Sequence, residues 1–265
     1  MIKIQNNIYT TNLNSVGLSQ TSKGVLLKWN DKDNYYKSGS LHYGIFNKVQ
    51  PIVECICSQI REKLGFSGVD YKLTAIESKG CEDFDAQNIL CCVSENFLHE
   101  DEILVTFGRH YKSFKEKITY DHIINEFKEF EEEINQTLIL DFIVNNIDRH
   151  FNNFGYIVNG KKRYCPIFDN GLSLYSDLNL EEIKNINKNK YMMKRFDKSK
   201  PFEKKHMSQI KLIQNLPKIN LENDNEDFLN IIKSYEDNLG KERVNAMCNL
   251  VEERLNYVRK IYSNV

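Results

Sequence analysis

Three polar side chains between residues 148 and 169 have the types and spacing that phosphoryl transfer requires. Asp148 and Asn153 lie five residues apart in a polar segment, and Asp169 comes directly before an Asn-Gly pair. Transfer of a γ-phosphoryl group needs a carboxylate to orient the attacking hydroxyl and oxygen ligands for the Mg²⁺ on the nucleotide phosphates. Mg²⁺ prefers sparse sites of hard oxygen ligands completed by water and phosphate. We therefore expect Asp148 to orient the acceptor, and Asn153 and Asp169 to hold Mg²⁺.

The elements on either side of these residues would have to position them. Apolar residues at spacings of three and four predict one long amphipathic helix from about Asp121 to Asn145, which would fix the loop after it. Two short apolar strands joined by Asn159-Gly160 would then return the chain, so that Asp169 meets the same metal. An ordinary surface loop rich in Asn and Asp is the alternative, but loop, hairpin and acidic turn agree with one mechanism.

This stretch resembles the HipA-like Ser/Thr kinases, and in particular their compact CtkA-like branch. The resemblance is carried by IDRHFNNFGYI and CPIFDNGLSL, where the matching positions are Asn146, Asp148, His150, Asn153, Phe168 and Asp169. Asn152 stands where the family usually has Lys, so a phosphate-neutralising charge is absent at that position. The Asp-Arg-His run is also similar to the catalytic loop of phosphoinositide kinases, which leaves the acceptor open.

The resemblance covers most of the chain from about Ser22 to Phe202 and implies a two-lobed α+β fold of the protein-kinase type. A small β-rich N-lobe would span residues 1–95, and a mainly helical C-lobe would span residues 96–265. It further implies a Ser/Thr protein kinase that uses ATP and Mg²⁺ and acts on a protein substrate. Many relatives are toxins with an antitoxin partner, so such a partner is an expectation here as well.

The polar segment Asn12 to Lys23 lies between two predicted strands, where a loop would cover the nucleotide phosphates. It matches neither a Walker A loop nor the glycine loop of protein kinases. Some relatives phosphorylate a serine of their own in this loop, which makes Ser15, Ser19 and Ser22 candidate autophosphorylation sites. A plain hairpin turn is the alternative.

We expect Lys28, positioned by Glu54, to bind the α- and β-phosphates. Lys28 ends an apolar strand, and residues 51–64 present one apolar helical face, with Pro51 in the first turn and Gly65 as the C-terminal cap. Glu54 would pair with Lys28 and hold it against the phosphates. The alternatives are a solvated lysine at a strand end and a glutamate that only complements the helix dipole.

The remaining nucleotide contacts are expected after the strand that ends near residue 93. Glu95 and Phe97 match a Glu-x-Phe hinge of the family, whose backbone groups would bond the adenine edge, and Phe168 completes the expected nucleotide-binding set. A strand end without that role is the alternative. His150 would either stabilise charge near the γ-phosphate or brace the loop through hydrogen bonds.

Composition excludes several other classes of protein. A net charge of -1 over 265 residues gives no case for nucleic-acid binding or for a polybasic membrane surface. No apolar run approaches the roughly 18 residues of a membrane span, and the first ten residues lack the pattern of a signal peptide. The seven cysteines form no Cys-x-x-Cys, and we expect reduced core thiols in a cytoplasmic protein. The basic run Lys184 to Lys205 would face an acidic substrate or only solvent.

Three classes of function therefore remain to be separated. They are a Ser/Thr protein kinase, a lipid or small-molecule kinase with the same metal loop, and a nucleotide-binding module without catalysis. Lys28, Asp148, Asn153 and Asp169 argue against the last, because a binding module needs no acceptor-orienting carboxylate.

Overall fold

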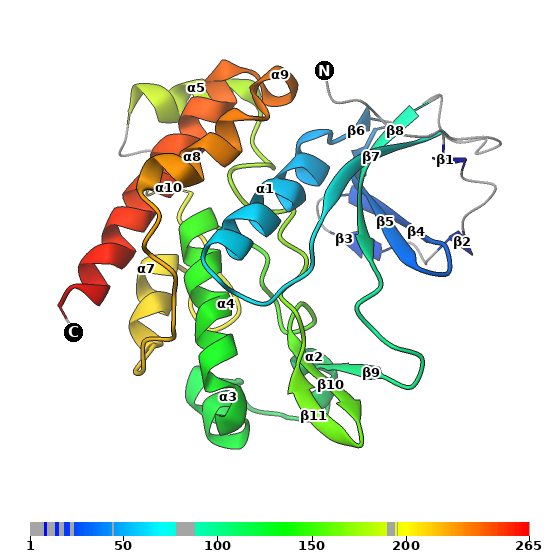
Figure 1. Ribbon diagram of the computed structural model, residues 1–265, viewed down its shortest axis with the longest axis vertical. Helices are drawn as coiled ribbons and strands as arrows, with labels where there is room; N and C mark the ends of the chain where they lie inside the picture. The colour runs from blue at the N-terminus through cyan, green and yellow to red at the C-terminus, as the bar shows by residue number, and fades with distance from the viewer. Residues whose placement is uncertain are drawn as a thin grey trace.

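The computed structural model describes residues 8–9, 14–15, 19–21, 24–43, 45–77, 88–189, 194 and 196–264, with side chains from residue 26 onward. Strands dominate the N-terminal part and helices dominate the rest (Figure 1). This mixed architecture of a sheet-rich part followed by a helical part confirms the predicted fold class.

The larger sheet belongs entirely to the N-terminal part. Its strands are β1 (Ile8–Tyr9), β2 (Asn14–Ser15), β3 (Ser19–Thr21), β4 (Gly24–Asn30), β5 (Asn34–His42), β6 (Ile45–Phe46), β7 (Lys72–Glu77) and β8 (Asn88–Glu95). They follow the order β1-β7-β8-β5-β4-β2, with β3 paired to β4 and β6 paired to β5. Only β1 and β7 run parallel among these described pairs. Strand β5 therefore lies inside the sheet, between β4 and β8.

The β4–β5 hairpin places two lysines on one face of this sheet. Its register pairs Lys28 with Lys37, after an irregularity between Leu26 and Lys28. Side chains of directly paired residues lie on the same face of a sheet. The turn between the strands is closed by Asp31, whose Oδ1 accepts a hydrogen bond from the Asn34 amide at 2.7 Å.

Helix α1 (Val49–Lys63) lies between β6 and β7 in the chain and corresponds to the helix predicted over residues 51–64. Asn47 Oδ1 accepts the Val49 amide hydrogen at 2.9 Å and caps its start. Gly65, with φ of 79°, allows the chain to leave the helix in the left-handed conformation, as predicted for a terminal glycine. The helix packs against β5 and β8 on one side and against α8 (Asn225–Lys233) on the other (Figure 1). It is consequently buried on both faces.

The single long helix predicted from Asp121 to Asn145 is wrong. The chain instead forms α3 (Tyr120–Glu126), a short 3-10 turn η2 (Lys128–Phe130) and α4 (Glu131–Val144). The break lies at Phe127, whose φ of -123° and ψ of 50° are not helical. Phe127 and Phe130 are both buried, and the Phe127 ring meets the ring of Phe107 edge-on at 5.1 Å, so tertiary packing accompanies the break.

Helix α4 leads directly into the polar loop that the sequence singled out. It ends at Asn145, which adopts the left-handed conformation with φ of 53°. A second sheet follows with the order β11-β10-β9, built from β9 (Ile103–Thr106), β10 (Gly155–Asn159) and β11 (Lys161–Tyr164). The hairpin at Asn159-Gly160 is thus confirmed, although β11 is polar rather than apolar.

The remaining helices are α2 (Phe107–His110), α5 (Leu180–Lys188), α7 (His206–Gln209), η3 (Ile210–Leu212), α9 (Glu236–Leu239) and α10 (Lys241–Tyr262). Of these, α7, η3 and α10 contact α4, whereas α5 and α9 contact α10 and α2 contacts β9. Helix α10 contacts α4, α5 and α8, and one apolar core joins them to α1. Within the described ranges, no helix has the length and apolar character that crossing a membrane requires. The six described cysteines are free and buried, and Cys81 lies outside the described residues.

Candidate active site

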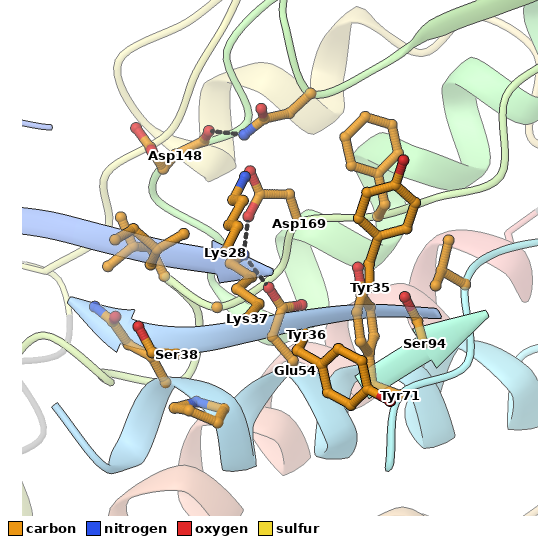
Figure 2. Close-up of a pocket in the computed structure, with 18 of the residues that line it drawn as sticks. Lys28, Tyr35, Tyr36, Lys37, Ser38, Glu54, Tyr71, Ser94, Asp148 and Asp169 are labelled. Carbon is orange, nitrogen blue, oxygen red and sulfur yellow. Dashed lines mark hydrogen bonds and ion pairs between the residues drawn. The ribbon is translucent and has the colours of Figure 1, made fainter. Parts of the chain in front are cut away.

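A cavity of about 630 Å³ lies between the large sheet and the loops that follow α4 (Figure 2). Eight of the predicted site residues line it, namely Lys28, Glu54, Phe97, Asp148, His150, Asn153, Phe168 and Asp169. Glu95 is exposed at the end of β8 and is not among the lining residues. Of the serine candidates, Ser22 lies outside the described residues, and Ser15 and Ser19 are described only as backbone.

The ion pair of Glu54 is made by Lys37, so the predicted pair between Lys28 and Glu54 is wrong. Lys37 Nζ lies 2.5 Å from Glu54 Oε1 and also forms an ion pair with Asp169. Figure 2 shows the Lys37 side chain between these two carboxylates, with Lys28 beside Asp169. The reason is the strand that each lysine occupies, because β5 packs directly against the helix that carries Glu54.

Burial and the attraction between opposite charges shift the pKa values of Lys28, Lys37 and Asp169. Burial acts to lower the pKa of Lys37, but Asp169 and then Glu54 raise it well above its usual value. Burial acts to raise the pKa of Asp169, but Lys37 and then Lys28 bring it well below its usual range. Burial lowers the pKa of Lys28, and Asp169 opposes that effect. Asp169 is therefore an anion beside the cationic Lys37 near neutral pH.

Glu54 also holds the turn that carries Asp169. Its Oε2 accepts the Asn170 amide hydrogen at 2.8 Å, and its carboxylate is only 1% exposed. Asp169 itself has φ of 61°, an uncommon conformation for a residue with a side chain. At Gly171 an added Cβ would lie 3.1 Å from Glu54 Oε1, so the missing side chain lets the turn approach α1 closely. One carboxylate thus positions both Lys37 and the turn.

The backbone of the polar loop is fixed by the loop's own side chains. Asn146 Oδ1 accepts the Asp148 amide hydrogen at 3.0 Å. The Asp148 carbonyl accepts from the His150 amide at 2.7 Å and from Asn153 Nδ2 at 3.1 Å. The Asp148 carboxylate is 27% exposed, and its Oδ1 lies 2.7 Å from Lys200 Nζ. His150 therefore braces the loop through its backbone and through its ring, which is 43% exposed at the cavity and whose Nδ1 accepts the Asn152 amide hydrogen at 3.3 Å.

Arg149 joins the polar loop to the Asp169 turn. Its guanidinium is fully buried and forms a two-bond contact with Asp141 of α4, at 2.9 and 3.0 Å. It also donates to the carbonyls of Asn153 at 2.9 Å and Phe168 at 2.5 Å. A further bond of 2.6 Å reaches Asn170 Oδ1. The arginine is thus a structural element beneath the cavity rather than a phosphate ligand.

The other end of the cavity is apolar and aromatic. Phe97 and Phe168 stack with ring centroids 5.7 Å apart. The Asn96 amide donates to the Asp33 carbonyl at 2.8 Å, which ties the segment after β8 to the β4–β5 turn. Leu98 and Leu104 also line this end. Its chemistry suits the flat face of a nucleobase, in the place predicted for the hinge.

The oxygen donors present fit Mg²⁺, which takes one or two carboxylates and completes its shell with water and phosphate. Asp169 offers carboxylate oxygens, and Asn153 uses its amide nitrogen on Asp148, which leaves the amide oxygen for a cation. Among the described residues, no three or more His, Cys, Asp or Glu side chains form a group arranged for a metal. A site of one carboxylate and one amide would depend on the nucleotide phosphates.

Two residues of the site were missed from the sequence. Lys37 was missed because the strand 34–42 was not predicted, although Lys28 and Lys37 lie equally far from the centre of the polar turn between them. A hairpin centred on that turn would have placed both lysines opposite each other. The run Lys200 to Phe202 also resembles the compact branch, but nothing in it predicts the contact with Asp148, which Lys200 reaches across 52 residues of sequence.

Comparison with protein-family models and with curated proteins found no match. Among solved structures, the chain is similar to the proinflammatory kinase CtkA of Helicobacter pylori, with a TM-score of 0.66 and 14% identity over 98% of this chain and 99% of that one. It is also similar to HipA of Shewanella oneidensis MR-1, from a complex with HipB and operator DNA, with a TM-score of 0.46 and 10% identity. That second match covers 93% of this chain and 63% of HipA. The first likeness confirms the predicted kinase-like fold.

Proposed function

We propose that this chain is an ATP- and Mg²⁺-dependent Ser/Thr protein kinase of the HipA-like type. One observation carries the proposal: the Lys37–Glu54 pair, Asp148, Asn153 and Asp169 all border one cavity. These are the parts that phosphoryl transfer needs, namely a cation for the phosphates, metal ligands and a carboxylate for the acceptor. The fold shared with CtkA over nearly the whole of both chains supports it.

Each residue has a separate role in this proposal. Lys37, held by Glu54, binds the α- and β-phosphates in place of the predicted Lys28, and Lys28 adds a second positive charge on the same face. Asn153 and Asp169 hold Mg²⁺, which would neutralise charge on the phosphates when bound. Asp148 orients the acceptor hydroxyl and takes its proton late in the transfer.

The cavity has a volume that suits a nucleotide, and its apolar and charged side chains lie at opposite ends, as the base and the phosphates require. Its volume of about 630 Å³ lies within the usual range for small-molecule sites. Aromatic and aliphatic side chains, among them Phe97 and Phe168, border one end, and the charged cluster borders the other. We propose that adenine lies between the apolar side chains, with its edge toward the backbone of Glu95 and Phe97.

Two finer parts of the proposal concern acceptors and partners. The first is autophosphorylation at Ser15, Ser19 or Ser22, which rests on their position in a segment where some relatives phosphorylate a serine of their own. The second is an antitoxin that binds this chain, which rests on the resemblance of the chain to a family in which many members are toxins. Mass spectrometry of the purified chain tests the first, and co-purification from the native host tests the second.

The function is tested by incubating the purified chain with Mg²⁺ and radiolabelled ATP, followed by mapping of phosphosites. We expect label on Ser or Thr of the chain or of an added protein, and its loss in Asp148→Asn. Asp101→Asn is the matched control, because Asp101 is exposed in a turn far along the chain from the loop. Label on phosphoinositides instead of protein would favour a lipid kinase. ATP binding without any transfer would contradict catalysis.

A further inference from the structure

The Asp148 carboxylate is held in a different way from its backbone. The backbone is fixed by three hydrogen bonds within the polar loop. The carboxylate has one close partner among the described residues, Lys200, whose Nζ lies 2.7 Å from Oδ1. Near the other oxygen, the Nε2 atom of His150 lies 3.9 Å from Oδ2, which is beyond hydrogen-bonding distance. Rotation of the carboxylate is therefore restrained mainly by Lys200.

Lys200 belongs to a short loop, residues 197–205, which we call the Lys200 loop. Its first residue, Asp197, forms an ion pair of 2.9 Å with Arg254 of α10, and both side chains are 9% exposed. The loop is closed on itself, because the Ser199 amide donates to the Lys204 carbonyl at 3.1 Å. Ser199 Oγ also donates to the Glu203 carbonyl at 2.8 Å. The backbone that carries Lys200 is thus anchored to the helical core.

The loop is also attached to the polar loop that carries Asp148. Gln209 is buried, donates to the Lys200 carbonyl at 2.8 Å and accepts from the Phe202 amide at 3.1 Å. The Phe202 ring is 5% exposed and meets the ring of Phe151 edge-on at 5.7 Å. Phe151 lies three residues after Asp148. Lys200 is consequently fixed relative to Asp148 by the hydrogen bond at its carbonyl and by the packing of Phe202 against Phe151.

An exposed ion pair contributes little to stability, and the Lys200 and Asp148 side chains are 53% and 27% exposed. The value of such a contact lies in orientation, because a carboxylate that directs a reacting hydroxyl must be held in one geometry. Lys200 occupies Oδ1 and leaves Oδ2 unbonded beside the cavity that Asp148 lines. The two oxygens of one carboxylate therefore have different surroundings.

We propose that Lys200 is a positioning residue for Asp148, an inference that rests on the function proposed above. Lys200 holds Oδ1, so that Oδ2 accepts the hydrogen bond of the acceptor hydroxyl. In the transfer, the hydroxyl oxygen bonds to the γ-phosphorus as the bond from that phosphorus to the bridging oxygen of ADP breaks. The hydroxyl proton passes to Oδ2 and then to solvent. Lys200 takes no part in that exchange and keeps the accepting oxygen in place.

The kinetic test compares Lys200→Met, Lys200→Arg and Lys198→Met, with dephosphorylated casein as acceptor. We expect Lys200→Met to lower kcat by about 10- to 100-fold, with KM for ATP changed less than about twofold and the melting temperature within about 2 °C. Lys200→Arg keeps the charge and should recover a large part of kcat. Lys198 is exposed on the same loop, so its variant should match wild type. Wild-type kcat in Lys200→Met, or no recovery in Lys200→Arg, would overturn the proposal.

A second measurement does not depend on activity. Crystal structures of the wild type and of Lys200→Met should show one Asp148 rotamer in the former and a changed or divided one in the latter. The same single rotamer in both would overturn the positioning role. If the wild type transfers no phosphate at all, the proposed function fails, whereas these two structures still decide whether Lys200 positions the carboxylate.

Discussion

At the scale of single residues, Lys28 and Lys37 differ in what holds each ammonium group. Both project from one face of the β4–β5 hairpin, but only Lys37 is in direct ion-pair contact with Glu54 and Asp169 among the described residues. Burial lowers the pKa of Lys28. Burial also acts to lower the pKa of Lys37, but Asp169 and Glu54 raise it well above its usual value. Lys37 therefore has the fixed position and the assured charge that a phosphate-binding lysine needs.

A pair of substitutions separates the two lysines. Lys37→Met should lower kcat/KM for ATP by about 100-fold or more, because it removes a charge-stabilising contact and leaves two carboxylates facing each other. Lys28→Met should cost about tenfold or less, since it leaves the Lys37–Glu54 pair intact. Steady-state kinetics provide the measurement, with Lys32→Met in the exposed turn as the control. A larger loss in Lys28→Met than in Lys37→Met would return the role to Lys28.

Asp169 links the same cluster to the pH dependence of stability. Its folded pKa is depressed chiefly by Lys37, against the effect of burial, whereas an unfolded Asp has a pKa of about 3.9. A depressed pKa contributes stability above the unfolded value, and that contribution is lost as pH falls below it. The free energy of unfolding should thus decline less steeply below about pH 4 in Asp169→Asn than in wild type. Urea titrations at several acidic pH values measure this, and parallel curves would contradict it.

At the scale of elements, Arg149 ties α4, the polar loop and the Asp169 turn into one unit. Its partner Asp141 is 0% exposed, so removing the guanidinium leaves a carboxylate buried without its countercharge. Arg149→Met should therefore cost about 3–5 kcal/mol of unfolding free energy. Chemical denaturation measures the loss, with the exposed Arg109→Met as the control. Adding Asp141→Leu should recover part of it, and no recovery would mean that the pair is not the cause.

Elements that are determined by their neighbours in the chain could be predicted from the sequence. The hairpin at Asn159-Gly160 and the cap at Gly65 follow from local backbone preferences, and both are present. Lys37 required the register of two strands, which a single strand does not reveal. The break at Phe127 lies where its ring packs against Phe107 and Tyr156, two contacts with other segments that a helical periodicity does not indicate. The contact of Lys200 with Asp148 depends on a chain reversal over 52 residues, which no local pattern around Lys200 indicates.

At the scale of the whole molecule, the cavity is formed by two parts of the chain that meet across α1. The sheet contributes Lys28 and Lys37, whereas the loops after α4 contribute Asp148, Asn153 and Asp169. Glu54 bonds to both parts, through Lys37 and through the Asn170 amide. The relative placement of the two parts thus decides whether phosphates, metal and acceptor can meet.

The most direct test is a crystal structure with Mn²⁺ and a non-hydrolysable ATP analogue, since Mn²⁺ takes the same hard oxygen ligands as Mg²⁺ and scatters anomalously. We predict an anomalous peak that places Mn²⁺ within bonding distance of oxygens of Asn153 and Asp169. The γ-phosphate should lie toward Asp148, and the adenine should lie near Phe97 and Phe168. A nucleotide bound elsewhere, or a metal in contact with neither Asn153 nor Asp169, would contradict the account.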